Sequence, residues 1–181
     1  MENNLNNQPA LSKEQIDSVI SLYSSGKLSE AINTIKSLNE LYPNVPLLFN
    51  ILGACYKAQG SLEESVKIFK IAIEIKPDYA EAHNNLGLTL MQLNQIDSAT
   101  DSFKAAIAII PLYAEAHNYL GVALKKLNQF EEASESYQKA IAIKPEFAEA
   151  HNNLGNVLKS LGRFKEAVKS YKSTLLIKPN F

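Results

Sequence analysis

The chain has little of several features that commonly point to a function. It contains one cysteine, Cys55, which excludes an internal disulfide and any multi-cysteine zinc site. Its 18 Lys and Arg residues nearly balance 19 Asp and Glu residues, which leaves a formal net charge of -1. The charges are dispersed along the chain, which argues against nucleic acid or an anionic membrane surface as the partner.

Long hydrophobic runs and a secretory leader are also missing. Hydrophobic residues make up 46% of the 181 residues, but polar residues interrupt them every few positions. No stretch approaches the roughly 20 apolar residues that a membrane-spanning helix needs. The opening MENNLNNQPALS is rich in asparagine and has neither the basic nor the apolar region of a signal peptide. We therefore expect a soluble, cytoplasmic protein with a disordered lead-in over residues 1–11.

What the chain does contain is a repeat. The same phrase returns as AEAHNNLG at 80–87, AEAHNYLG at 114–121 and AEAHNNLG at 148–155, an interval of 34 residues. Repeats of this length are typical of arrays in which each unit packs only on its neighbours. The other markers at this interval are Pro43, Pro77, Pro111, Pro145 and Pro179, together with Gly53, Gly87, Gly121 and Gly155, and with His83, His117 and His151.

Each repeat is predicted to be a pair of helices. Apolar residues are spaced three and four apart, as on one face of a helix. A residue that readily adopts the left-handed conformation ending a helix stands in one register of every repeat. These residues are Gly26, Gly60, Asn94, Asn128 and Gly162. Proline then ends the second helix, and the resulting five units are 12–45, 46–79, 80–113, 114–147 and 148–181.

Two serines have the spacing of a capping box at a helix start. Ser12 precedes Gln15 by three residues, and Ser61 precedes Glu64 by three. In such a box the serine side chain accepts from a backbone N–H three residues on. We therefore expect helices to begin directly after Ser12 and Ser61.

In this register the chain resembles the tetratricopeptide repeat family from residue 12 onward. The family has a bulky residue, Leu-Gly and a leucine or aromatic residue in the first helix, then alanine, an aromatic residue, a small residue and proline. The resemblance implies an all-α fold, a right-handed superhelix or α-solenoid of five helix-turn-helix repeats. The matches in 80–113 are His83, Leu86, Gly87, Leu90, Ala99, Phe103, Ala106 and Pro111.

Some positions depart from the family pattern. Ser65 replaces the alanine that begins the second helix of 46–79, and Thr174 replaces a small alanine in 148–181. In the first unit Gln15, Ser18 and Val19 miss the pattern, while its second helix recovers it. An atypical first repeat is expected where an array presents a polar outer surface.

Small residues are expected at the closest contacts between helices, which pack about 8–10 Å apart. The glycines of the first helices and Ala99, Ala133 and Ala167 of the second helices suit such contacts. The large residues that fill the space between neighbouring units are then predicted to be Phe69, Phe103, Tyr137 and Tyr171. Cys55 is expected to be a small buried core residue.

The repeated glutamate and histidine do not predict catalysis. Equivalent histidines on successive units should lie about 10 Å or more apart, whereas zinc ligands lie about 2.0–2.2 Å from one ion. Glu81 and His83 are two residues apart and point to different sides of a helix. We predict that each histidine replaces the family's aromatic residue, and that the chain has no catalytic residues, no metal and no cofactor.

The resemblance also implies where a partner binds, because the family's first helices line the concave surface. An asparagine row could pair with the backbone of an extended peptide, since each amide offers a donor and an acceptor. Duplicated asparagines with local hydrogen bonds are the alternative. The four rows are Leu47, Glu81, Glu115 and Glu149; Asn50, Asn84, Asn118 and Asn152; Ala54, Leu88, Val122 and Asn156; and Lys57, Met91, Lys125 and Lys159.

Two subfamilies help to define the partner. Members that grip a C-terminal carboxylate use lysine, arginine and asparagine, but the row of glutamates and the residues Asn85, Tyr119 and Asn153 stand here instead. The AEAHNNLG phrase is similar to the repeat arm of O-linked N-acetylglucosamine transferases, in which the asparagine before Leu-Gly holds substrate. Asn85 and Asn153 match that pattern, while Tyr119 and Ile51 interrupt it.

We therefore predict a protein-interaction module that binds an extended peptide or a helix. The alternative is the N-terminal substrate arm of a larger transferase, of glycosyltransferase or sulfotransferase type. The last predicted helix, 164–177, carries Leu175, Leu176 and Ile177 without a following polar helix. A longer protein, weak self-association through this helix, or fraying are the expected consequences.

Overall fold

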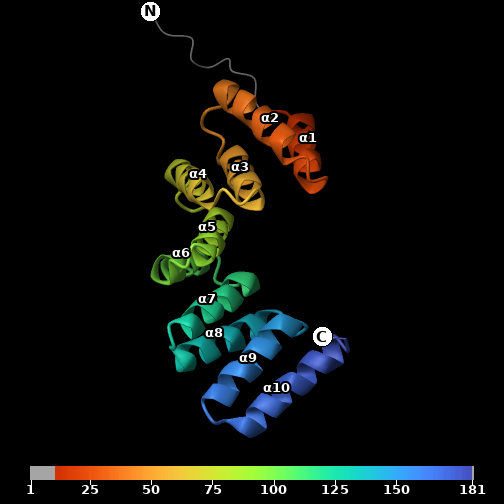
Figure 1. The fold of residues 1–181 in the computed structure, drawn as a ribbon, viewed down its shortest axis with the longest axis vertical. Coiled ribbons are helices and arrows are strands. Elements are labelled where there is room, and N and C mark those ends of the chain that lie inside the picture. The colour runs from red at the N-terminus through yellow and green to blue at the C-terminus, as the bar shows by residue number, and fades with distance from the viewer. Residues whose placement is uncertain (1–10, 181) are drawn as a thin grey trace, which may run out of the picture. The chain divides into compact units, whose positions relative to one another are not determined.

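The structure is a computed structural model that describes residues 11–180, and these form ten α-helices paired into five hairpins (Figure 1). The predicted all-α fold of five helix-turn-helix repeats is confirmed. The predicted disordered lead-in falls almost entirely on residues 1–10, outside the described residues. The chain divides into two compact units, Met1–Pro77 and Asp78–Phe181, which are described separately.

The first unit holds two hairpins. In it α2 packs on α3, and α1 contacts both α2 and α3. Its helices are α1 (Lys13–Ser24), α2 (Leu28–Leu41), α3 (Pro46–Ala58) and α4 (Leu62–Ile75).

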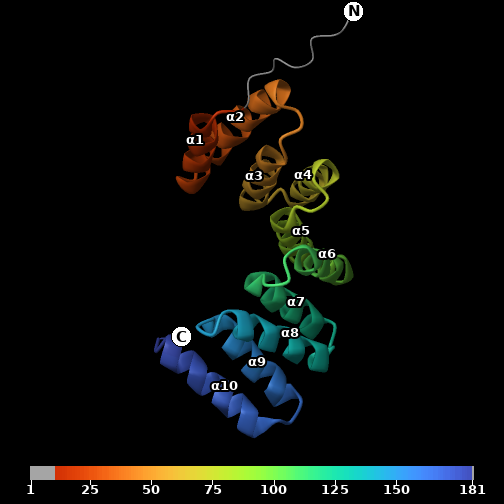
Figure 2. The ribbon, with the colours of Figure 1, turned by 180° about the vertical axis from the view of Figure 1, so that it is seen from behind.

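The second unit holds three hairpins, seen from behind in Figure 2. Each second helix packs on the first helix of the next hairpin, α6 on α7 and α8 on α9. The first helices also touch one another, because α7 contacts α5 and α9. The helices are α5 (Ala80–Gln92), α6 (Ile96–Ile109), α7 (Ala114–Lys126), α8 (Phe130–Ile143), α9 (Ala148–Ser160) and α10 (Phe164–Ile177).

The turns between paired helices have the predicted left-handed residues. Asn94 and Asn128 have φ of 58° and 59°, and the glycines of the same register have φ of 73° to 82°. The backbone N–H of Gln95 donates to the carbonyl of Leu90, which satisfies a carbonyl left over at the helix end. The prediction from this register is confirmed, and it defines where each first helix stops.

One of the two predicted capping boxes forms. The backbone N–H of Gln15 donates to Ser12 Oγ at 3.3 Å, and the N–H of Ser12 donates to Gln15 Oε1 at 2.9 Å. Helix α4 begins directly after Ser61, as predicted, but the predicted capping box is wrong, because the side chain of Ser61 makes no capping hydrogen bond. Ser61 has ψ of 69° where Ser12 has an extended ψ of 156°, so the side chain of Ser61 is not set to accept from the first turn of α4.

The two helices of each hairpin meet at a glycine. A Cβ atom built on Gly87 would lie 2.6 Å from Cε1 of Phe103, and one built on Gly121 would lie 2.7 Å from Cε1 of Tyr137. Gly53 and Gly155 meet Phe69 and Tyr171 in the same way. The aromatic residues were predicted to pack between neighbouring units, but each ring also packs on the glycine of its own hairpin. The glycine leaves the space that the ring occupies.

The first repeat replaces this contact by a different pair. Val19 stands in the register of the glycines and Ile35 in that of the rings, and both are fully buried in the core of the first unit. A larger residue on the first helix is thus matched by a smaller one on the second, which conserves the packed volume. Val19 departs from the family's sequence pattern, but it occupies the same place in the packing as the glycines of the later repeats.

The two hydroxyl residues that depart from the family pattern also have a clear place. Ser65 Oγ donates to the carbonyl of Gly53 at 2.8 Å, and Thr174 Oγ1 donates to the carbonyl of Ser170 at 3.2 Å. Each hydroxyl replaces an alanine methyl in a buried position and finds a backbone acceptor there. Among the described residues, no helix is long and apolar enough to cross a membrane.

Substitution of Gly87 by alanine should destabilise the second unit. The added Cβ overpacks against Phe103 at a cost of about 1–3 kcal/mol, which exceeds the gain of about 0.5–1 kcal/mol that alanine has over glycine in a helix. Urea denaturation followed by far-UV circular dichroism measures the change. A second substitution, Phe103→Leu, makes room for the Cβ, so the double variant should lose less than the two single losses added. A Gly87→Ala variant as stable as the parent would contradict the packing argument.

Candidate binding face

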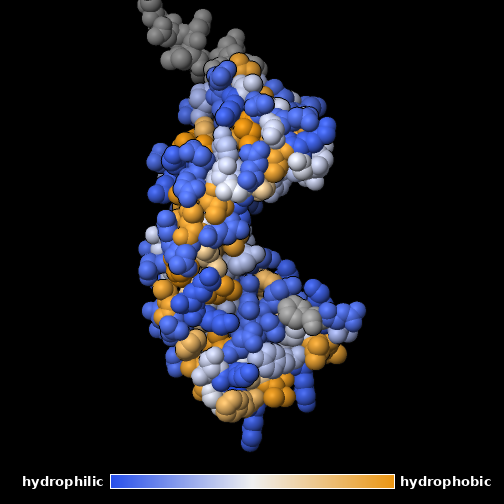
Figure 3. Space-filling model, viewed as in Figure 1, coloured by the Kyte–Doolittle hydropathy of each residue, from blue (hydrophilic) through white to orange (hydrophobic). Residues whose placement is uncertain are grey.

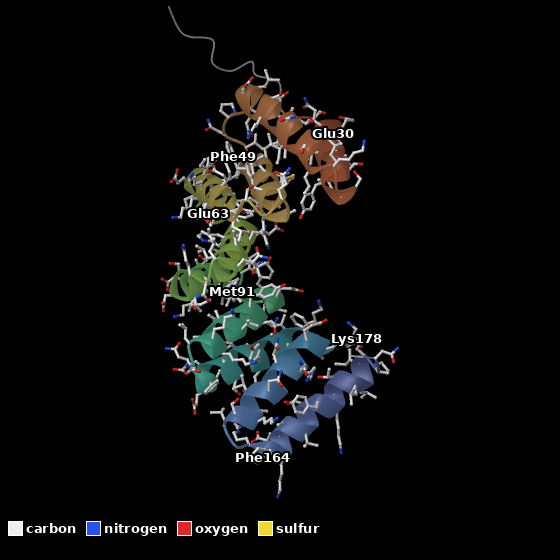
Figure 4. All side chains as sticks on the ribbon, in the orientation of Figure 1. Glu30, Phe49, Glu63, Met91, Phe164 and Lys178 are labelled. Atoms are coloured by element: carbon white, nitrogen blue, oxygen red, sulfur yellow. The ribbon has the colours of Figure 1, made fainter. Side chains whose placement is uncertain are left out.

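The predicted binding residues of the second unit lie on α5, α7 and α9. Met91, near the C-terminal end of α5, is labelled in Figure 4. We call the surface that these residues form the first-helix face. Its residues are Glu81, Asn84, Asn85, Leu88 and Met91 of α5; Glu115, Asn118, Tyr119, Val122 and Lys125 of α7; and Glu149, Asn152, Asn153, Asn156 and Lys159 of α9.

The equivalent residues of the first unit lie on α3. Asn50 is buried there, while Leu47, Ala54 and Lys57 are half-buried. Removal from water lowers the pKa of Lys57 from its ordinary value. The asparagine of this row is therefore buried, as are two of those in the second unit.

The asparagine row of the second unit is less accessible than the sequence suggests. Asn84 and Asn118 are only 5% and 4% exposed, whereas Asn152 is half-buried. Asn118 Oδ1 accepts a hydrogen bond of 3.2 Å from Nδ2 of Asn153, on the next first helix. The side-chain oxygen of Asn118 is therefore already engaged by a residue of the next repeat.

Asn84 differs from Asn118. Its Oδ1 is buried and has no hydrogen-bond partner among the described residues. The position that holds Asn153 one repeat later is occupied by Tyr119, which stacks on Phe103 with ring centroids 5.8 Å apart. A buried acceptor without a donor is costly, so Asn84 is a distinctive group on this face.

The acidic row shows the same contrast between repeats. Lys144 Nζ lies 3.0 Å from Glu115 Oε1, and Lys178 Nζ lies 4.0 Å from Glu149 Oε1. The hydrogen bond from Lys144 lowers the pKa of Glu115. Glu81 has no ion pair among the described residues, because Ile110 stands where those lysines stand one and two repeats later.

Tyr113 lies beside the glutamates of α5 and α7. Burial raises its pKa, and the carboxylates of Glu81 and Glu115, followed by Tyr119, raise it further. The Tyr113 hydroxyl therefore lies within electrostatic reach of both carboxylates. Sequence reasoning did not include Tyr113 in the site, since its position in the loop before α7 carries an aromatic residue in most repeats.

The remaining residues of the face are mostly half-buried. Leu88, Met91, Val122 and Lys125 are each partly open to solvent. Asn156 Oδ1 accepts a hydrogen bond of 2.9 Å from the hydroxyl of Tyr171, so this amide is already engaged. The open part of the face along α5 and α7 thus combines apolar side chains with the charged residues Glu81 and Lys125.

The histidines belong to the framework. His117 Nε2 lies 3.0 Å from the carbonyl oxygen of Pro111, and His151 Nε2 lies 2.9 Å from that of Pro145. A carbonyl only accepts, so Nε2 carries the proton and donates. Each of these two rings closes the loop before its helix, a role beyond the predicted replacement of an aromatic residue. No cluster of three or more His, Cys, Asp and Glu side chains in residues 11–180 is arranged to hold a metal.

Cys55 is fully buried, as predicted. Burial raises the pKa of its thiol to about 11, since the thiolate would lose its hydration. The thiol therefore remains protonated near neutral pH, which does not suit a nucleophile.

A pocket of 370 Å³ lies on a different side of α9 from the first-helix face. Leu154 and Leu158 of α9 contribute apolar lining, and Glu166 and Lys169 of α10 contribute charged lining. Sequence reasoning missed it, because its residues on α9 occupy the framework positions of the repeat. Its lining is completed by Gln138, Ile141, Ala142, His151, Ser170 and Ser173.

Helical hairpins packed through glycines and aromatic rings and stacked on one another define the class of protein as a helical repeat array. Family models described as tetratricopeptide repeat match residues 80–111 and 148–181, and one described as TPR repeat matches 53–94 and 123–162. The chain belongs to the tetratricopeptide repeat family, and it is a protein-interaction module.

Several solved structures share the fold. A crystal structure of MamA is 27% identical, with a TM-score of 0.82 over 89% of this chain and 94% of that chain. MamA 41-end from Desulfovibrio magneticus RS-1 is 22% identical, with a TM-score of 0.83 over 95% and 97%. YrrB, described as a TPR protein with an unusual peptide-binding site, is 20% identical, with a TM-score of 0.76 over 97% and 89%. No curated protein matches the chain.

The hydroxyl groups of two equivalent tyrosines should contribute to stability with opposite sign. The Tyr137 hydroxyl is buried and has no hydrogen-bond partner within residues 11–180, because Val122 stands where Asn156 receives the hydroxyl of Tyr171. Tyr137→Phe should therefore stabilise the chain by up to about 1 kcal/mol, while Tyr171→Phe should cost about 0.5–1.5 kcal/mol. Urea denaturation of the two variants tests this. A larger loss for Tyr137→Phe than for Tyr171→Phe would be the opposite result.

Proposed function

We propose that the chain binds an extended polypeptide, or a helix, of a partner protein along the first-helix face of the second unit. The observation that carries this is the half-buried apolar set Leu88, Met91, Tyr119 and Val122 on adjoining helices α5 and α7. Partly open apolar side chains beside polar ones are typical of surfaces that bind a partner.

Charged residues border this apolar set. Glutamates lie near the N-terminal ends of the first helices, and Lys125 and Lys159 lie in the last turns of α7 and α9. A polypeptide lying across these helices would meet both signs of charge, which gives it a direction and a register. This suits a sequence-selective partner more than a general one.

The asparagine row contributes less than the sequence suggested. Asn118 is occupied by Asn153, so a continuous ladder for a peptide backbone is not offered in this state. Asn152 is the most exposed of the three in the second unit. We propose that Asn152 contacts the partner directly, and that Asn118 holds α7 and α9 in register.

The alternative function, a substrate arm of a larger transferase, would use the asparagine before Leu-Gly to hold substrate. Asn153 is one of these, and its Nδ2 is engaged by Asn118 within the array. This engagement favours the interaction module. The peptide-binding site named for YrrB belongs to that protein, but the shared fold supports a peptide as the ligand class here.

Peptides selected from a phage-displayed library of random 12-residue sequences provide the probe for the first-helix face. Val122→Arg should weaken their binding to the whole chain about tenfold, which corresponds to about 1.4 kcal/mol, because it places a bulky charge in the apolar set. Gln138→Arg adds the same side chain at an exposed position of α8 and should leave the affinity unchanged. Fluorescence anisotropy measures both. Equal affinities for the parent and the two variants would contradict the proposal.

Weak self-association through α10 is the second part of the proposal. Leu176 is 85% exposed, Val168, Leu175 and Phe164 are also exposed, and Figure 3 shows hydrophobic surface where α10 lies. In α6 and α8, which each pack on a following first helix, the residues in the registers of Val168 and Leu175 are buried or half-buried, whereas those in the register of Leu176 are exposed. A helix of a second copy is therefore the occupant that fits the side with Val168 and Leu175. Light scattering should give a mass that rises with concentration, and Val168→Lys with Leu175→Lys should abolish the rise. A constant monomeric mass for the parent would contradict it.

A further inference from the structure

In the repeat 80–113 the carboxylate of Glu81 has no lysine partner among the described residues, whereas the equivalent glutamates of the later repeats do. Glu115 and Glu149 are each near a lysine that lies 29 residues further along the chain. At this distance from Glu81 stands Ile110, and Glu81 has no ion pair among the described residues. Glu81 is exposed, so its negative charge is available to a cation from outside the chain.

In the same repeat the side-chain oxygen of Asn84 has no hydrogen-bond donor in the described part of the chain, whereas that of the equivalent Asn118 has one. Asn118 receives its hydrogen bond from the residue that lies 35 positions later, Asn153. At this distance from Asn84 stands Tyr119, and Asn84 Oδ1 is buried without a hydrogen bond in residues 11–180. Asn84 follows Glu81 by three residues, so the two side chains share one side of α5. The unpaired carboxylate of Glu81 and the unpaired side-chain oxygen of Asn84 therefore lie close together on α5.

The surroundings of this spot are aromatic and apolar. Tyr113 is half-buried directly before α7, and Tyr119 on α7 stacks on Phe103. The loop before α7 has exposed Ile110 and Leu112, the latter 75% exposed, where the next repeat has Lys144 and Glu146. Two acceptors thus lie among groups that suit the aliphatic stem of a long side chain and the faces of rings that attract a cation.

We infer that Glu81, Asn84, Ile110, Tyr113 and Tyr119 form a subsite for a lysine or arginine side chain of the bound polypeptide. The ammonium or guanidinium group pairs with the Glu81 carboxylate and donates to Asn84 Oδ1, replacing the lysine and the asparagine that later repeats supply from within the array. Its methylene stem packs on Ile110 and the tyrosines. The inference rests on the proposed function, because the side chain arrives as part of a polypeptide on the first-helix face.

Titration of the isotopically labelled chain with Nα-acetyl-argininamide tests the subsite. Nα-acetyl-citrullinamide, which has the same shape without the charge, is the matched control probe. The arginine compound should shift the amide resonances of α5 and of residues 110–113, with an affinity about fivefold above that of the citrulline compound, the upper range for an exposed ion pair. Equal affinities of the two compounds would overturn the inference.

Substitutions copied from the next repeat identify the residues. Ile110→Lys supplies Glu81 with the array's own cation and should reduce the affinity for the arginine compound to that of the citrulline compound. Tyr119→Asn supplies Asn84 with a donor and should weaken binding as well. Glu81→Gln should abolish the preference for arginine, while Glu115→Gln, whose carboxylate already pairs with Lys144, should keep it. Far-UV circular dichroism checks that each variant is folded, and an Ile110→Lys variant with unchanged binding would overturn the inference.

The selected peptides separate this inference from the proposed function. Peptides that bind through the subsite should be enriched in lysine or arginine, and Ile110→Lys should weaken them. Peptides that Val122→Arg releases but Ile110→Lys does not would overturn the subsite and leave the proposed function standing. Peptides unaffected by Val122→Arg would overturn the proposed function, and with it the subsite as a site for a polypeptide.

Discussion

The contact between a glycine and an aromatic ring, present in every hairpin after the first, is the constraint on which the rest of the structure depends. In the second unit it joins Gly87 to Phe103, Gly121 to Tyr137 and Gly155 to Tyr171, each closer than a side chain of any size would allow. This contact sets the separation of the paired helices. The inner side of α5, α7 and α9 is occupied by this contact, so only the residues on their outer side are left for the binding that we propose.

Most of the fold was predictable because packing in a repeat array is local. A residue that ends a helix, such as Asn94 with its positive φ, acts through its own backbone and is visible in sequence. The wrong prediction of a capping box at Ser61 also has a local cause, namely the backbone conformation of that residue. A serine followed by a glutamate three residues later is compatible with a capping box. The backbone conformation of Ser61 after the preceding turn, however, is not compatible with one.

The site was less predictable, since its properties depend on pairs that are about one repeat apart. The spacing of four asparagines indicated their common side of the helices but not that Asn153 binds Asn118. Val19 and Ile35 show the same limit in the core, where two departures from the family pattern compensate each other. The pairs of the first-helix face appear in a single sequence only when residues 29 or 35 positions apart are compared.

Such comparisons also separate defects of packing from features of a binding surface. Tyr137 and Asn84 each have a buried polar atom without a hydrogen-bond partner among the described residues. The residue that would supply the partner, judged from the next repeat, is replaced by Val122 for Tyr137 and by Tyr119 for Asn84. The hydroxyl of Tyr137 lies at the contact with Gly121, inside the hairpin, where a ligand has no access without opening the helices. Asn84 lies one helical turn from the exposed carboxylate of Glu81 and beside a loop that is apolar in this repeat alone among 46–181. An unpaired polar group in the core costs stability. The buried Asn84 amide instead lies next to the exposed Glu81 carboxylate, where we propose that a cation of a bound polypeptide supplies the missing partner. The place where this array departs from its own pattern is therefore the place where it can be selective.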